Sequence, residues 1–228
     1  MAAGATICSG GFMARSLVTL AVAWAALQVA AGQLSFTHTF DTEGPGPLPA
    51  GFELAAMRQD TSGTWRVRRD GANGVLVHQG SDKASGFALA LAPAAPLRDV
   101  QTSVRLRLAG GARAGGLVWR YADASNFYGA ILDLAKAEVV LFRVTAGNRT
   151  FLEREDDLEL DPAAWHMLKV VHDESRVQVS LGGIRVFEER DRRSERGSAP
   201  GRTGVIAAGA ADVWFDDLRI EPDRDRRR

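Results

Sequence analysis

The sequence predicts an all-β domain, a sandwich of antiparallel strands, and three observations lead to this prediction. Apolar and polar residues alternate with a period of two in many short runs, as expected of strands with one buried face. Glycine, at 24 of 228 residues, recurs between these runs without forming a repeat, which indicates many tight turns. Beyond the N-terminal segment, no run shows sustained helical periodicity, so no helical layer is expected.

The N-terminal segment has the pattern of a secretory signal peptide. Its only charge, Arg15, precedes an apolar run from Leu17 to Val29, which ends in Ala30-Ala31-Gly32. A positive start, a short apolar stretch and small residues at the end define such a peptide, whereas a membrane span needs about 20 apolar residues. We predict a signal peptide at 1–32, with Met13 as an alternative start. The mature chain is then exported, periplasmic or extracellular, without a membrane span; an uncleaved anchor is the alternative.

The strand runs follow in order along the remaining chain. They cover residues 36–40, 75–79, 87–91, 100–108, 117–121, 127–134, 139–144, 165–172, 176–181, 184–188, 205–208 and 213–220. Gly182-Gly183 stands between two alternating runs and predicts a two-residue hairpin loop. Because no linker or repeat divides these runs, residues 33–221 are predicted to form one domain, followed by a disordered charged tail at 222–228.

Composition excludes several classes of function. The 28 Lys and Arg residues balance 28 Asp and Glu residues, so the chain lacks the basic footprint of a nucleic-acid-binding domain. Its single cysteine, Cys8, lies in the predicted signal peptide, which excludes thiol catalysis and cysteine metal sites in the mature chain. The sequence also lacks the His-Glu-x-x-His metal motif, the Gly-x-Ser-x-Gly nucleophile elbow and a phosphate-binding loop.

Several stretches resemble a known family. The stretch 115–123, followed by Asn126-Phe127-Tyr128, is similar to the central motif of that family, and 165–170 and 215–220 are similar to its later strands. These residues resemble the secreted bacterial concanavalin A-like lectin/glucanase proteins, which are related to laminin-G-like domains and to the 3-keto-disaccharide hydrolase domain. Over residues 34–221 the resemblance implies a jelly-roll sandwich of two antiparallel sheets, one of them curved around a concave face.

Polar side chains on the strand face opposite the core predict a ligand site. Arginine offers a planar fork of donors for vicinal hydroxyls or a carboxylate, and tyrosine adds an aromatic surface. The predicted ligand-binding residues are Arg105, Arg120, Tyr121, Tyr128, Asp133 and Arg143. The alternative is an ordinary solvated sheet face, and a bulge would invert the assignment. The tryptophans expected in the core are Trp65, Trp119, Trp165 and Trp214.

Two acidic groups carry further predictions. The first and last strands are adjacent in the implied fold, so Asp41 could approach Asp216 and Asp217. Related sandwiches hold a structural calcium there through oxygen ligands, and the alternative is a set of carboxylates bonded to backbone. The stretch Glu155-Asp156-Asp157-Leu158-Glu159 formally matches the Glu-x-Asp-x-Glu motif of family-16 glycoside hydrolases. Because Asp156 is not apolar and the segment lies in a connection, we interpret it as a solvated acidic loop.

Three functions remain open from the sequence. The first is an exported carbohydrate-binding, lectin-like sandwich that takes a saccharide ligand. The second is a glycoside hydrolase acting on a 3-keto-disaccharide or a related glycoside, with Asp133 as the candidate catalytic residue and no evident second carboxylate. The third is a structural or adhesive domain without a small ligand. A second carboxylate buried beside Asp133 would favour the hydrolase.

Overall fold

A computed structural model describes residues 1, 35–57, 63–80, 86–108, 112–193 and 199–223. The chain divides into two units, Met1–Gln33 and Leu34–Arg228, and the second contains the strands described below. The predicted signal peptide at 1–32 lies outside the described residues except for Met1. Within the described part of the chain, no helix has the length and hydropathy that a membrane span requires.

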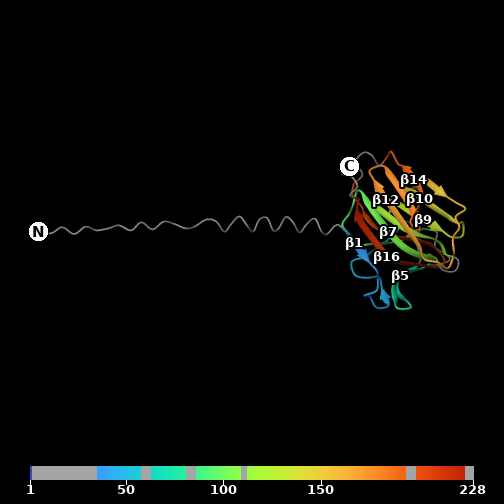
Figure 1. Cartoon of the computed structure of the whole chain (residues 1–228), viewed down its shortest axis with the longest axis horizontal. Coiled ribbons are helices and arrows are strands. Elements are labelled where there is room, and N and C mark those ends of the chain that lie inside the picture. Colours follow the sequence, from blue (N-terminus) through green and yellow to red (C-terminus); the bar gives the residue numbers. More distant parts are fainter. Residues whose placement is uncertain (2–34, 58–62, 81–85, 109–111, 194–198, 224–228) are drawn as a thin grey trace. The chain divides into compact units, whose positions relative to one another are not determined.

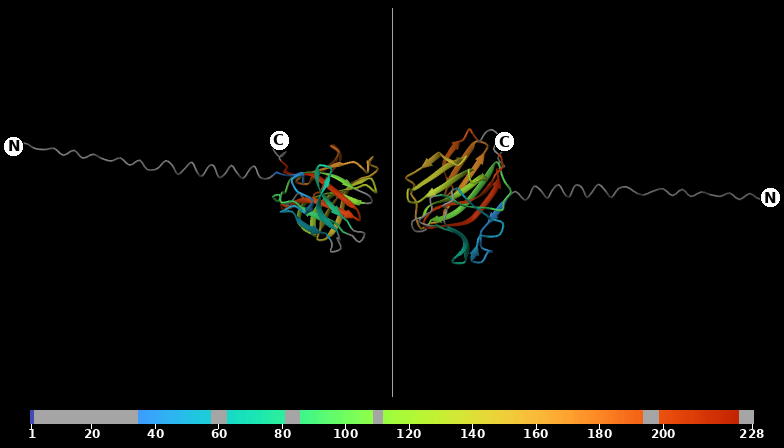
Figure 2. Two further views of the ribbon diagram at one scale, coloured as in Figure 1. Left: turned by 90° about the horizontal axis from the view of Figure 1, so that it is seen from below. Right: turned by 180° about the vertical axis from the view of Figure 1, so that it is seen from behind.

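Two antiparallel sheets build the domain, which confirms the predicted all-β sandwich (Figures 1 and 2). Sheet A contains, from edge to edge, β14 (Ile184–Arg190), β13 (Arg176–Leu181), β12 (His166–Asp173), β7 (Val100–Leu108), β16 (Asp212–Pro222), β5 (Asn73–Gln79), β4 (Thr64–Asp70) and β2 (Gly46–Pro47), and β1 (Phe36–His38) pairs with β16. Sheet B contains β11 (Asn148–Glu155), β10 (Glu138–Thr145), β9 (Asn126–Asp133), β8 (Ala112–Asp123), β15 (Arg202–Gly209), β6 (Ala88–Leu91) and β3 (Glu53–Ala56).

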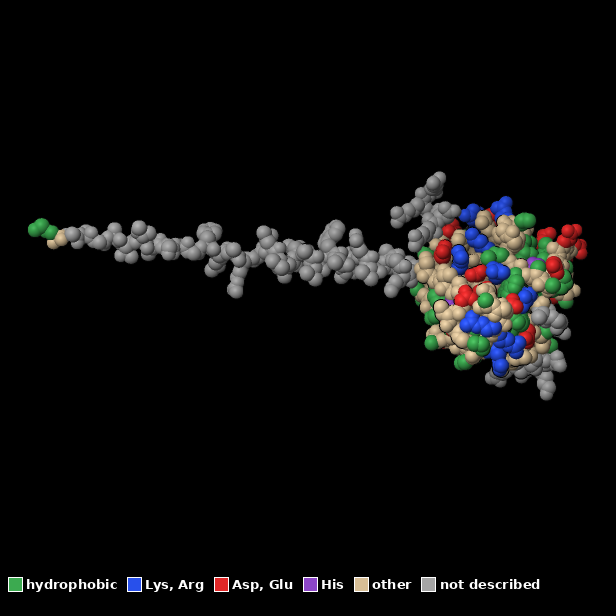
Figure 3. All heavy atoms as spheres, turned by 60° about the horizontal axis from the view of Figure 1, so that its bottom comes forward, with side chains coloured by type: hydrophobic (Ala, Val, Ile, Leu, Met, Phe, Trp, Pro, Cys, Tyr) green, Lys and Arg blue, Asp and Glu red, His purple; other side chains and the backbone are tan. Residues whose placement is uncertain are grey.

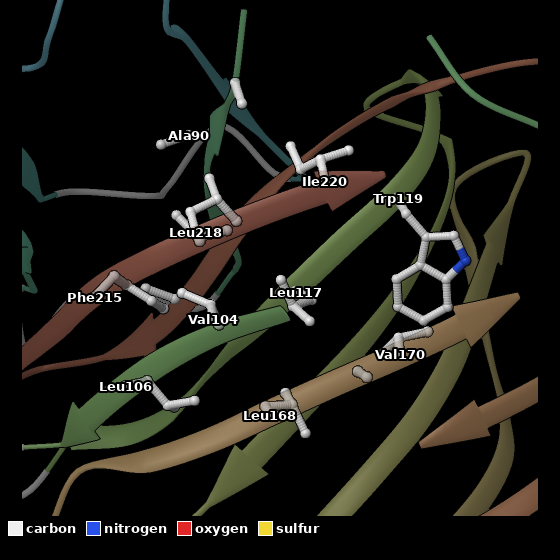
Figure 4. Close-up of a cluster of buried hydrophobic side chains, with 14 of the residues drawn as sticks. Ala90, Val104, Leu106, Leu117, Trp119, Leu168, Val170, Phe215, Leu218 and Ile220 are labelled. Atoms are coloured by element: carbon white, nitrogen blue, oxygen red, sulfur yellow. The ribbon is translucent and has the colours of Figure 1, made fainter. Parts of the chain in front are cut away.

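Side chains from both sheets fill the space between them (Figure 4). Val104 and Leu106 of β7 meet Leu117 and Trp119 of β8, and these four side chains are fully buried. Burying one such apolar side chain stabilises the fold by about 1.5–3 kcal/mol. On the outside, acidic and basic side chains lie among one another on the face shown in Figure 3, in keeping with the balanced charge.

Sheet B is apolar on both of its faces. Val118, Phe127, Ile131, Val140 and Phe142 point away from the inter-sheet core and form a second buried cluster on the outer face. This explains why the sequence around these residues shows continuous apolar runs instead of alternation, since a strand buried on both faces has no polar side. The outer face of sheet B therefore has an apolar floor.

The predicted hairpin at Gly182-Gly183 is present. Both residues have positive φ, 59° and 85°, as a two-residue loop of the primed type requires, and Leu181 pairs with Ile184 across it. Four strands were not predicted: β2, β3, β4 and β11. β4 alternates only two buried apolar residues with arginines, and β11 is an edge strand whose side chains are mostly exposed, so neither has a strong apolar period.

Candidate functional site

Tyr128 and Arg143, two of the predicted ligand residues, face the interior of the sandwich. The hydroxyl of Tyr128 donates to Oδ2 of Asp191 at 2.8 Å, and Nη1 of Arg143 donates to the same oxygen. All three residues are buried. Burial and the hydrogen bond to Asp191 raise the pKa of Tyr128. Burial acts to raise the pKa of Asp191, but the hydrogen bonds from Arg143 and Tyr128 outweigh it and lower that pKa. The three side chains thus bond to one another inside the sandwich.

Arg120 also points inward, because a bulge changes the direction of its side chain. The register of β8 against β9 shifts after Trp119, and Arg120 has a positive φ of 47°. Its guanidinium donates to the carbonyl of Arg98 at 2.6 Å and to that of Glu174 at 3.1 Å, and it stands over the ring of Tyr128. The bulge thus inverts the face that strict alternation assigns to Arg120.

Trp119 and Trp65 lie in the core as predicted. The indole of Trp119 donates to Nδ1 of His172 at 2.8 Å, and the histidine is fully buried. Burial, followed by the charge of Arg120, lowers the pKa of His172 to about 3, so the imidazole is neutral and accepts this hydrogen bond.

Arg105 lies on the opposite side of the molecule, on the outer face of sheet A. It pairs with Asp217 at 3.3 Å and stands over the ring of Trp165, while Arg107 lies over both Trp165 and Trp214. The prediction that these two tryptophans belong to the core is wrong. Trp214 on β16 and Trp165, the residue before β12, lie on the outside and are partly exposed, and arginine side chains stand over their rings.

A hollow of about 540 Å³ opens on the outer face of sheet B, where the strands have small residues. Its floor is apolar and consists of Ala114, Ile131, Val140, Ala208 and Gly209. Its wall contains Met57, Phe87, Arg149 and Phe151, and its polar end contains Asp133, Lys136 and Glu138. Asp133 is the predicted ligand residue that lines this hollow, whereas Tyr121, on the same face, packs against Phe127.

Two carboxylates lie opposite each other at the polar end. Asp133 closes β9 and Glu138 opens β10, and they are direct cross-strand partners with 9% and 5% exposure. Glu138 pairs with Lys136 at 3.2 Å and with Arg154 at 3.5 Å. Oδ1 of Asp133 accepts a hydrogen bond from the backbone N–H of Ala135 at 3.1 Å. In the described part of the chain no cation pairs with Asp133.

Aromatic rings and one arginine form the wall of the hollow. Phe87 stacks on Phe142 with ring centroids 5.3 Å apart. The guanidinium carbon of Arg149 lies 4.7 Å from the ring centroid of Phe151 and 5.4 Å from that of Phe87. Phe151 itself is 61% exposed, although it is a large apolar side chain on an edge strand. The arrangement offers an accessible apolar ring beside a planar hydrogen-bond donor.

A smaller hollow of about 290 Å³ adjoins the first along β11. The two share the side chains of Lys136, Glu138, Val140 and Phe151 in their linings. Phe151 and Glu138 therefore lie at the junction of two depressions that together follow the edge of sheet B.

The sequence did not identify Phe87, Glu138, Arg149 and Phe151 as site residues. The expected strand began at Val139, one residue after Glu138, although Glu138 continues the outward set of Val140 and Phe142. Arg149 and Phe151 lie on β11, which had no apolar period. The available signal was Phe151, an aromatic residue that only Leu152 accompanies in an otherwise polar stretch.

The three residues predicted to bind calcium bond to other groups. Oδ1 of Asp41 accepts a hydrogen bond from the N–H of Gly74 at 2.9 Å, which lowers the pKa of Asp41, and Oδ2 of Asp216 accepts one from Asn73 at 3.0 Å. Burial raises the pKa of Asp216 to about 6, and the charge of Asp217 adds to this rise. Among the described residues, no three acidic, histidine or cysteine side chains are arranged to hold a metal ion. Calcium here stays a prediction.

The acidic stretch 155–159 does not form a strand with three aligned carboxylates. Glu155 ends β11, and Asp157, with a positive φ of 56°, and Glu159 follow in the connection to β12. All three side chains are exposed. The interpretation as a solvated acidic loop agrees with this geometry.

The fold defined above is a two-sheet sandwich of the concanavalin A-like and galectin-like type, and comparisons with solved structures agree. The carbohydrate-binding module CBM66 from Bacillus subtilis is similar with a TM-score of 0.57 and 21% identity, over 74% of this chain and 94% of that chain. A protein of unknown function with a galectin-like fold from Bacillus subtilis has a TM-score of 0.56 and 12% identity, over 82% and 98% of the two chains. A non-specific endo-β-1,3(4)-glucanase of family GH16 has a TM-score of 0.56 and 13% identity, over 81% and 89%.

Neither a family model nor a curated protein matches the sequence. At identities of 12–21% the structural likeness shows the fold alone, and the same fold serves both binding modules and hydrolases. Function has to be argued from the hollow and its residues.

Proposed function

We propose that the chain is an exported carbohydrate-binding sandwich that holds a saccharide in the hollow on the outer face of sheet B. The observation that carries the proposal is the composition of this hollow: an exposed phenyl ring, Phe151, stands beside Arg149, and the buried side chains of Asp133 and Glu138 line the same hollow. Its volume of about 540 Å³ falls within the range of about 300–1,000 Å³ that is typical of small-ligand sites.

The chemistry of these groups suits a sugar. A pyranose ring has an apolar face of C–H groups, which the Phe151 ring and the apolar floor would cover, and an equatorial rim of hydroxyls. Carboxylates accept hydrogen bonds from those hydroxyls, and the guanidinium of Arg149 donates to them. The resemblance in fold to a carbohydrate-binding module supports this proposal without identifying the sugar.

A thermal melt of residues 33–228 with a panel of saccharides tests the proposal. The panel contains cellotriose, laminaritriose, xylotriose, arabinotriose and trehalose. A ligand at about 100 times its dissociation constant adds about 2.7 kcal/mol to the stability of the native state. For a domain of this size the midpoint should rise by roughly 5–10 °C, because each kcal/mol is worth about 2–4 °C.

Two variants link any shift to the hollow. Ala208→Phe fills the floor, and Phe151→Ala removes the exposed ring; both should abolish or weaken the shift while the unliganded protein stays folded. Arg105→Ala, on the outer face of sheet A, is the matched control and should leave the shift unchanged. A shift that survives Ala208→Phe would place the ligand elsewhere, and no shift with any sugar would favour the alternative of a structural or adhesive domain.

A further inference from the structure

Among the described residues no cation pairs with the carboxylate of Asp133, and we infer that the saccharide bound in the hollow carries an ammonium group, as an amino sugar does. The inference rests on the proposed saccharide binding and names the class of sugar that the site selects. Asp133 is only 9% exposed and lines the hollow. Burying a charged group costs free energy unless an opposite charge and hydrogen bonds compensate for it. A ligand that brings a cation would supply this compensation.

The turn between β9 and β10 holds the carboxyl group of Asp133 in one orientation. Asp133 ends β9, and its Oδ1 accepts a hydrogen bond from the backbone N–H of Ala135 at 3.1 Å, as in an Asx turn. Its Oδ2 has no hydrogen-bond partner in the part of the chain that the structure describes. One oxygen therefore bonds within the turn, and the other is left for a donor group in the hollow.

The neighbouring carboxylate, that of Glu138, already has cations beside it. Nζ of Lys136 lies 3.2 Å from Oε1 of Glu138, and Nη1 of Arg154 lies 3.5 Å from Oε2. Glu138 is the direct cross-strand partner of Asp133, and like charges in directly opposed positions destabilise a sheet. Because Lys136 and Arg154 compensate only one of the two carboxylates, a further cation at Asp133 would complete the charge balance of the polar end.

The other cation of the lining, Arg149, belongs to the wall and not to the polar end. Arg149 pairs with Val144 near the end of β10, whereas Glu138 begins that strand. The guanidinium carbon of Arg149 lies 4.7 Å from the ring centroid of Phe151. The hollow thus combines a carboxylate without a cation at one end with an aromatic ring and a guanidinium on its wall. An amino sugar suits this arrangement with its ammonium group at Asp133, its ring on Phe151 and its hydroxyls toward Arg149.

Three trisaccharides that differ only in the substituent at C2 test the inference by calorimetric titration of residues 33–228. Fully deacetylated chitotriose has an amine at C2 of each unit, triacetylchitotriose has a neutral amide there, and cellotriose has a hydroxyl. At pH 6 the amine is protonated, since its pKa resembles that of an α-amino group, about 7.7–8.0. The deacetylated form should bind about ten- to a hundredfold more tightly than the other two, the range that a hydrogen bond to a charged group contributes. Glucosamine, galactosamine and mannosamine, each compared with its parent hexose, extend the test to other configurations.

Asp133→Asn removes the charge of the side chain and keeps its shape. The amide oxygen can still accept the hydrogen bond from Ala135, so the variant should fold and bind cellotriose as wild type does, whereas the preference for the amino sugars should disappear. Asp156→Asn is the matched control, because Asp156 is exposed directly after β11 and is not among the residues that line either hollow. This control should keep the preference. An equal loss in both variants would overturn the inference, because it would show a general effect of negative charge.

The outcomes separate this inference from the proposed function. Neutral sugars that bind as tightly as their amino counterparts would overturn the inference and leave saccharide binding in place, whereas an absence of binding by every sugar would remove both. Ethylamine, an ammonium group without a sugar ring, should bind far more weakly than glucosamine, and equal affinities would contradict selection of an amino sugar. The comparison among ligands uses wild-type protein, so it decides the inference even if Asp133→Asn does not fold.

Discussion

Replacing His78 with leucine should remove a large part of the acid sensitivity of this protein. The imidazole is 2% exposed and packs on Trp65 with ring centroids 4.8 Å apart. Neither of its ring nitrogens has a hydrogen-bond partner among the described residues. Burial therefore lowers the pKa of His78 from 6.5 to about 4, although the charge of Asp212 acts in the opposite direction.

The sign and size of the effect follow from proton linkage. Between pH 6.5 and about 4 the unfolded chain binds a proton on His78 and the folded chain does not, so the free energy of unfolding falls as the pH falls. Each pH unit in this window is worth about 1.36 kcal/mol. The stability that His78 contributes is complete above pH 6.5. About 2 kcal/mol of it is lost by pH 5 and about 3 kcal/mol by pH 4.

Urea unfolding of residues 33–228 at pH 7 and at pH 5 measures this difference. Wild-type protein should lose about 2 kcal/mol more than His78→Leu between the two pH values, with unchanged m-values. His166→Leu, on the half-exposed histidine at the start of β12, is the matched control and should lose as much as wild type. Equal losses in wild type and His78→Leu would refute the reasoning, because they would show that protonation of the buried imidazole costs nothing.

Three other changes test separate parts of the structure. Asp191→Ala leaves the buried guanidinium of Arg143 without its anion and should cost about 3–5 kcal/mol in urea unfolding, against well under 1 kcal/mol if the pair is solvated. Gly116→Ala should cost about 1–3 kcal/mol, because its Cβ would clash with the carbonyl oxygen of Ala130; an unchanged midpoint would contradict the close packing of β8 on β9. Calcium should raise the melting midpoint relative to chelator, and Asp217→Asn should abolish that rise; equal midpoints would exclude a calcium site.

The sandwich was predictable because the residues that face its core recur at every second position along several strands. Strand β7 shows the reason: five apolar or small residues alternate with polar ones, and the structure buries one set and leaves the other half-exposed. The same reasoning could not place Trp165 and Trp214. Trp214 lies on β16 and Trp165 directly precedes β12, and apolar residues follow closely in both segments. An aromatic ring is also stable outside, however, when an arginine stem and guanidinium cover it, as Arg107 does here.

The candidate site was predictable only in part, because alternation indicates which residues share a face of a strand but does not indicate bulges or which strands are neighbours. Asp133 was found since it ends an apolar strand with a carboxylate. For Arg120 the predicted face was wrong because a bulge in β8 turns its side chain inward. For Arg143 it was wrong because β10 is apolar on both faces, so alternation did not reveal which face is the inner one, and the side chain points inward to Asp191. Glu138 lies opposite Asp133 because of the register in which β9 and β10 pair. This register could not be predicted from the single sequence.

The two outer faces of the sandwich differ, and this difference is what favours sheet B as the functional face. On sheet A, Arg105 and Arg107 both lie over the ring of Trp165. Arg105 also pairs with Asp217, and Arg107 with Asp70, so these charged groups and this ring already have partners within the face. On sheet B the corresponding positions are small, including Ala114 and Ala208, and they leave an apolar floor open. The floor side chains Ala114, Ile131 and Val140 are only 2–8% exposed, so the accessible apolar group of the hollow is the ring of Phe151, which is 61% exposed. The carboxyl groups of Asp133 and Glu138 are buried beside this floor, and burying a polar group costs free energy unless it is hydrogen-bonded. The exposed ring and the buried carboxyl groups are both understandable if a saccharide covers the ring and hydrogen-bonds to the carboxyl groups.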